Sequence, residues 1–187
     1  MGTYQYSRLS RDTFEKKWRA RFDALFQHSD EGGEVHWIPD QVFAEVAKIT
    51  MYHPQPYYLR EDYHDFEKVL HHLREDEFAV VDKEALDTGS EQVGIVFHLQ
   101  QHTGGARDLR KYHIEGQPLE FFMFGRCLNW GFVSSEPYNI GILNADRTLL
   151  ASFIAERPPA SEEEIREYLE HTPTLYRSRF EQNYLEH

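Results

Sequence analysis

The sequence predicts an α+β fold, in which N-terminal helices and a C-terminal helix pack on one face of a mainly antiparallel, curved β-sheet. Three observations support this class. Apolar residues recur every three or four positions in the N-terminal part of the chain, and they alternate in steps of two in its middle. The apolar runs of the middle also follow one another too closely for the crossover helices that parallel strands require.

The N-terminal part contains three stretches with helical spacing. Asp12 and Glu15 have the spacing of a capping box in front of the first stripe. Pro39 stands where the first turn of a second helix tolerates it. The third stripe ends in the charged run 74–77. The predicted helices span about residues 11–28, 39–50 and 66–73.

The middle of the chain predicts strands. Val93, Ile95, Phe97 and Leu99 alternate with smaller or polar residues, which predicts a strand with that one face buried. Further strands are expected at about 110–115, 119–126, 130–135, 138–143 and 148–154. The stretch 144–147 is typical of a hairpin turn between the last two.

The C-terminal part predicts one more helix. Ser161 and Glu164 form a capping box, and the helix is expected to run to about His171. Residues 1–184 are expected to form a single domain, because no linker composition interrupts them. Residues 185–187 resemble the start of a purification tag and are left out of the functional argument.

The composition narrows the function classes. Lys and Arg number 20 against 32 Asp and Glu, a net charge of −12, which disfavours nucleic acid because phosphate binding needs a cationic field. No apolar run approaches the roughly 20 residues of a spanning helix, so no membrane contact is expected. The lone Cys127 fits a reducing compartment, which makes the cytoplasm the expected location.

Motifs of known chemistry are absent from the sequence. It contains no Gly-x-Ser-x-Gly elbow, no His-Glu-x-x-His pair and no glycine-rich phosphate loop ending in Lys-Ser/Thr. We therefore expect no catalytic residue, no cofactor and no metal ion. If a metal were bound, His98, His102 and His113 would be the first ligands to examine.

Two segments are candidates for a binding surface. Prolines stiffen the aromatic stretch 52–58, which favours presentation of its rings to a partner. The acidic run at the end of the third predicted helix is expected to be solvated and to steer a cationic partner. The candidate residues are Tyr52, His53, Tyr57, Tyr58, Glu75, Asp76 and Glu77.

The aromatic stretch 121–133, the connection 134–136 and the apolar run 138–143 together resemble the strand-turn-strand style of small acidic bacterial toxin-immunity proteins. The resemblance implies a non-enzymatic inhibitor of a basic protein toxin, and it assigns no functional residue. A second hypothesis stays open. It is a small-ligand-binding domain or enzyme, with a pocket between sheet and helices where Tyr57, His98, His113 and Glu136 converge.

Overall fold

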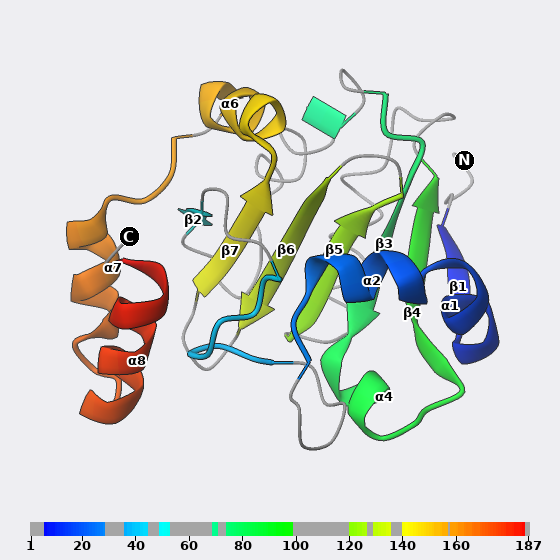
Figure 1. Ribbon diagram of the computed structural model, residues 1–187, viewed down its shortest axis with the longest axis horizontal. Coiled ribbons are helices and arrows are strands. Elements are labelled where there is room, and N and C mark those ends of the chain that lie inside the picture. The colour runs from blue at the N-terminus through cyan, green and yellow to red at the C-terminus, as the bar shows by residue number, and fades with distance from the viewer. Residues whose placement is uncertain are drawn as a thin grey trace, which may run out of the picture.

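A computed structural model of the chain shows an open seven-stranded sheet with helices around it (Figure 1). The structure describes residues 6–28, 36–44, 49–52, 69–70, 74–98, 120–126, 129–135, 140–156 and 158–185. The strands are β1 (Tyr6–Ser10), β2 (Ile49–Tyr52), β3 (Glu77–Asp82), β4 (Gln92–His98), β5 (Phe121–Gly125), β6 (Trp130–Ser135) and β7 (Ile140–Ala145). The helices are α1 (Arg11–Lys17), α2 (Arg19–Leu25), α4 (Lys83–Asp87), α6 (Arg147–Glu156), α7 (Glu162–Leu169) and α8 (Thr174–Tyr184).

The sheet is antiparallel at every pairing. Its strand order is β1-β4-β3-β5-β6-β7-β2, so β1 and β2 are the outer strands. Short connections join β5, β6 and β7, as antiparallel neighbours allow. The predicted α+β class with a mainly antiparallel sheet is confirmed.

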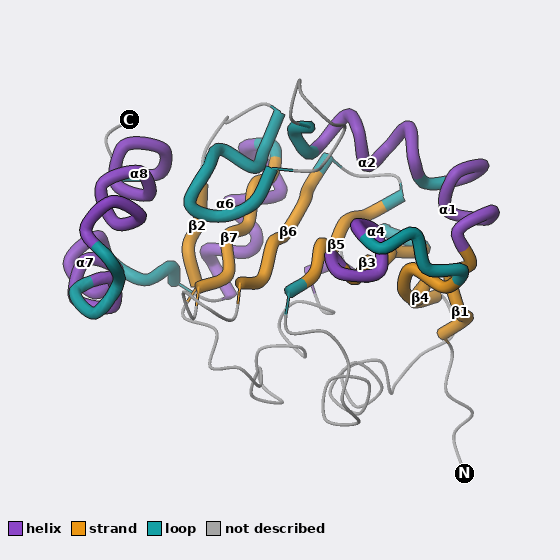
Figure 2. The backbone as a smooth tube through the Cα atoms, turned by 90° about the horizontal axis from the view of Figure 1, so that it is seen from below, coloured by secondary structure: helices purple, strands orange, loops and turns teal. Residues whose placement is uncertain are grey.

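Apolar side chains cover both faces of the sheet, which corrects the expectation of one covered face. The first cluster joins Phe122, Phe124 and Val133 to α1, α2, α7, α8 and the segment 36–44. The second joins Phe121, Met123 and Phe132 to α6 and to residues 69–70. Figure 2 shows α1 and α2 along one side of the sheet. Burial on both faces explains why the strands read as continuous apolar runs.

A bulge in β4 breaks the predicted alternation. Leu9 and Ser10 of β1 are consecutive but pair with Gly94 and Gln92, which leaves Val93 as an extra residue. Val93 therefore belongs to the first cluster, whereas Ile95 and Phe97 belong to the second. The expectation that all three share one face was wrong, because the bulge turns Val93 over.

The predicted helix over 11–28 forms as two helices. Ser10 caps α1 through its side chain, and the chain bends at Trp18 before α2 begins. Trp18 is 4% exposed and packs edge-on against Phe124, with ring centroids 5.6 Å apart. The apolar spacing thus identified the buried face correctly, although not the bend.

The predicted helix over 39–50 was wrong. Within 36–44, backbone groups bond to the end of α2: Gln27 N donates to Val42 O at 2.8 Å, and Ala44 N donates to Leu25 O at 2.9 Å. Residues 49–52 form β2 instead, paired with β7. Tertiary partners take the backbone groups that a helix would have used internally.

The predicted strand over 148–154 and the hairpin turn before it were also wrong. Asp146 Oδ1 accepts hydrogen bonds from the backbone N–H groups of Thr148 and Leu149, both at 3.0 Å, and so caps α6. Leu149, Leu150 and Phe153 then face the second cluster. Their spacing of one and four positions is typical of a helix as well as of a buried strand.

The C-terminal part matches its prediction and extends it. The capping box of Ser161 and Glu164 opens α7, as expected. The helix α8 was not predicted, and Leu185, which follows it, is buried in the first cluster. The predicted strand over 110–115 and most of the predicted helix over 66–73 lie outside the described residues. None of the described helices is long and apolar enough to cross a membrane.

Candidate functional site

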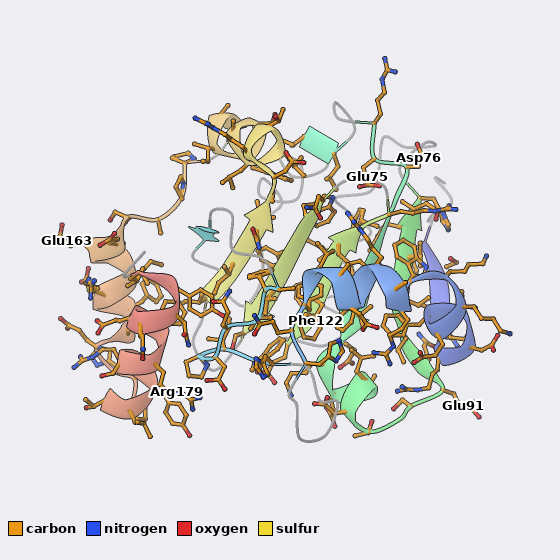
Figure 3. All side chains as sticks on the ribbon, viewed as in Figure 1. Glu75, Asp76, Glu91, Phe122, Glu163 and Arg179 are labelled. Atoms are coloured by element: carbon orange, nitrogen blue, oxygen red, sulfur yellow. The ribbon has the colours of Figure 1, made fainter. Side chains whose placement is uncertain are left out.

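Polar side chains gather at one end of the sheet, where β3 begins and where β4 and β5 end. In the register, Glu77 lies opposite His98, and Phe78 lies opposite Gly125. Figure 3 shows Glu75 and Asp76 at this end, just before β3.

Glu75 is a buried carboxylate, only 2% exposed. Its Oε2 accepts a hydrogen bond from Trp130 Nε1 at 3.2 Å, and its Oε1 accepts one from the backbone N–H of Arg126 at 3.1 Å. A buried charge is stable only when donors satisfy it, so these contacts fix Glu75 in place. The prediction that the run 75–77 is solvated at a helix end was therefore wrong for Glu75, while Asp76 and Glu77 are half-buried.

Four side chains form a second group, which we name the Glu77 cluster: Ser7, Glu77, His98 and Arg126. Ser7 Oγ lies 3.1 Å from His98 Nε2, and His98 Nδ1 lies 3.2 Å from Glu77 Oε1. Arg126 Nη1 donates to Glu77 Oε2 at 3.1 Å. Ser7 and Arg126 are exposed, so solvent reaches the cluster.

The proton positions in this chain of contacts follow from the donor inventory. An ionised carboxylate has no hydrogen to give, so Nδ1 of His98 donates to Glu77. In the neutral imidazole Nε2 is then the acceptor, and Ser7 donates its hydroxyl hydrogen to it. The arrangement can take a proton from Ser7, which is the chemistry of an activated hydroxyl.

Among the described residues, Tyr52 lies apart from Glu75, Asp76 and Glu77. Across the sheet, Tyr52 is aligned with Asp82, because the strand pairs run from Tyr52 through Gly141, Ser134 and Phe121 to Asp82. Asp82 is the last residue of β3, whereas Glu77 is the first. His53, Tyr57 and Tyr58 lie outside the described residues.

Of the four residues predicted to line the alternative pocket, the structure describes only His98. His98 belongs to the Glu77 cluster. Tyr57, His113 and Glu136 lie outside the described residues, as does His102. Within the described ranges, no group of three His, Cys, Asp or Glu side chains is arranged to hold a metal ion.

A second candidate lies on the C-terminal helices, far from the Glu77 cluster. Among the described residues, the large hydrophobic side chains exposed to solvent are Tyr168, Leu175 and Tyr176, of which Leu175 is 69% exposed. Glu163, Glu167 and Glu170 are also exposed, on and just after α7. We name these six residues the α7–α8 surface.

Hydrogen bonds hold the two helices of the α7–α8 surface to each other and to the segment 36–44. Arg166 Nη1 donates to Glu181 Oε1 at 2.8 Å and joins the two helices. Tyr184 OH donates to Asp40 O at 2.5 Å and accepts from the backbone N–H of Val42 at 3.1 Å. Burial raises the pKa of the Tyr184 hydroxyl well above its usual range. The helix pair is therefore fixed to the segment 36–44.

Sequence reasoning missed the residues that the structure brings forward. Ser7 and Arg126 carry no motif, and only strand pairing places them beside His98 and Glu77. The spacing of Ile165, Tyr168 and Leu169 predicts that all three face inward, but Tyr168 is exposed. Leu175 and Tyr176 lie on a helix that was not predicted. An apolar pair next to an acidic helix was the available signal for that surface.

Comparison of the chain with protein-family models, with curated proteins and with solved structures gives no match.

Proposed function

We propose that the chain is a binding protein whose acidic α7–α8 surface binds a basic protein, as an immunity-type inhibitor binds a basic toxin. The observation that carries the proposal is the placement of Tyr168, Leu175 and Tyr176, the exposed large hydrophobics of the described residues, on one helix pair. Tyrosine is enriched at the energetic centres of protein interfaces. Exposed acidic residues on the same helix pair suit a cationic partner.

The charge of α7 supports this proposal beyond what helix stability explains. Residues 161–170 hold one Arg and five Glu, so their net charge is 1 − 5 = −4. Glutamates in the first turn stabilise a helix through its dipole, and Glu164 completes the capping box. Glu167 and Glu170 lie at the other end, where the dipole favours cations. Helix stability therefore does not explain the presence of Glu167 and Glu170, whereas binding of a cationic partner does.

The partner is sought with a crosslinker on the surface itself. Tyr176 is replaced by a photo-crosslinking phenylalanine analogue, and the attached protein is identified by mass spectrometry. The proposal expects a protein of net positive charge that, once purified, binds the unmodified chain with an association rate that falls as salt rises.

Matched charge variants decide whether the acidic residues cause the binding. The variant Glu163→Gln, Glu167→Gln, Glu170→Gln should slow association. The control Glu84→Gln, Asp87→Asn, Glu91→Gln removes three exposed charges around α4, on another side of the molecule (Figure 3 labels Glu91 and Glu163), and should not. Tyr176→Ala should mainly speed dissociation. Equal association of both triple variants, or crosslinks to acidic proteins only, would contradict the proposal.

A further inference from the structure

We propose that Ser7, His98 and Glu77 form a nucleophilic relay that hydrolyses short-chain carboxylic esters, an activity separate from the binding proposed above. The two distances, 3.1 Å from Ser7 Oγ to His98 Nε2 and 3.2 Å from His98 Nδ1 to Glu77 Oε1, are those of a hydroxyl, its base and the group that orients the base. Such relays are recognised by geometry and roles, since unrelated folds supply the three residues in different chain orders.

Strand pairing holds the relay in place. Glu77 of β3 lies directly opposite His98 of β4, and Ser7 of β1 lies opposite Val96, which makes Ser7 the diagonal neighbour of His98. Opposite residues share a face of the sheet, as do residues two apart on a strand, so the three side chains emerge on one face. Groups carried on paired strands keep their geometry better than groups on loops.

Arg126 completes the orientation of the base. Its guanidinium donates to Glu77 Oε2, which leaves Oε1 for the N–H of His98. His98 is thereby held with Nε2 toward Ser7, in the tautomer that accepts a proton. Glu77 and Arg126 act as positioning residues, while Ser7 and His98 are the groups that react.

The proposed reaction balances with water alone. Ser7 Oγ attacks the ester carbonyl carbon while His98 Nε2 takes the hydroxyl proton, and the bond to the leaving alcohol breaks as His98 returns that proton to it. A water molecule then attacks the acylated Ser7, again giving a proton to His98. The acyl bond to Ser7 breaks, the carboxylic acid leaves, and Ser7 recovers its proton. Because Ser7 is exposed, an acyl group bound to it lies in contact with solvent. This exposure favours small acyl groups.

The experiment uses a fluorophosphonate probe on the folded full chain, with the modified residue identified by mass spectrometry. The relay predicts that the label is found on Ser7 and that Ser7→Ala removes it. The matched control Ser178→Ala, at an exposed serine of α8, should leave labelling unchanged. Hydrolysis of p-nitrophenyl acetate should fall about 10²-fold in His98→Gln, the usual contribution of a general base.

A pH profile separates a positioning role from a structural one. The labelling rate of the unmodified chain should rise with pH, as general-base catalysis requires, and Glu77→Gln should move the midpoint of that rise. A merely structural Glu77 would change stability and leave the midpoint in place. The proposal is overturned if the folded, unmodified chain carries no more label on Ser7 than on Ser178, or if His98→Gln labels Ser7 at the same rate.

Discussion

The indole Nε1 of Trp130 donates a hydrogen bond to Oε2 of Glu75 at 3.2 Å, although 55 positions separate the two residues in the chain. The contact joins the segment before β3 to the first residue of β6. Gly125 makes room for it, because a Cβ there would lie 2.0 Å from Glu75 Oε2 and 2.3 Å from Trp130 Nε1. Glu75, Gly125 and Trp130 are therefore closely packed at this end of the sheet.

Glu75→Ala is expected to lower the free energy of unfolding by about 2–3 kcal/mol, because it removes a charged acceptor and with it the hydrogen bond from the buried indole N–H of Trp130. Urea denaturation at neutral pH measures the loss. Glu91→Ala, at an exposed glutamate, is the control and should change stability by less than about 0.5 kcal/mol. Equal effects of the two substitutions would show that the contacts of Glu75 do not stabilise the fold.

Gly94→Ala tests the close approach of β4 to β3 beside the bulge. A Cβ at this position would lie 2.0 Å from the carbonyl oxygen of Val80, a backbone atom of the neighbouring strand that cannot turn away. We expect a loss of about 3 kcal/mol, the upper end of the usual range for overpacking, measured by thermal or urea unfolding. Gly89→Ala, where nothing lies within 4 Å but φ is +73°, should cost less, about 1 kcal/mol. A larger effect at Gly89 than at Gly94 would refute this account of the close approach between β3 and β4.

The predictable part of the fold is the part that local physics determines. Phe14 and Phe22 belong to the apolar stripe of the predicted helix over 11–28, which depends only on helical spacing, and both are fully buried. The capping box of Ser161 and Glu164 is equally local. The segment 36–44 was mispredicted because its backbone bonds to α2 and to Tyr184, partners that no sequence window contains.

The candidate site was hidden for the same reason. Ser7 and His98 stand 91 positions apart, and only the register of β1 on β4 makes them neighbours. Glu75 was read as part of a charged, solvated run, since a run of acidic residues normally is solvated. Its burial depends on Trp130 and the backbone of Arg126, which approach through the pairing of β3, β5 and β6.

Asp146→Ala tests the helix that replaces the predicted last strand. Its carboxylate accepts from the N–H groups of Thr148 and Leu149, and loss of such a cap usually costs about 1 kcal/mol. The loss should appear in urea denaturation, with little change for Asp146→Asn or Asp146→Ser, because both still cap a helix. If the serine variant were as unstable as the alanine variant, capping would not be the role of this residue.

Tyr184→Phe tests the anchor of the C-terminal helices through its pH dependence. At neutral pH the variant loses the hydrogen bonds to Asp40 O and from Val42 N, which we expect to cost about 1–2 kcal/mol. Burial raises the pKa of the folded tyrosine above its unfolded value near 10, so the folded state keeps the proton after the unfolded state begins to lose it. This contribution to stability is therefore complete below about pH 10 and declines as pH rises beyond it.

The difference in unfolding free energy between the unmodified chain and Tyr184→Phe should accordingly narrow above pH 10, by at most about 1.4 kcal/mol per pH unit. Urea denaturation at steps from pH 7 to pH 11 measures it. Tyr176→Phe changes an exposed tyrosine of the same helix and is the matched control. A Tyr184 difference that stays constant would mean that the hydroxyl is not buried, and that α8 is held to the segment 36–44 by other contacts.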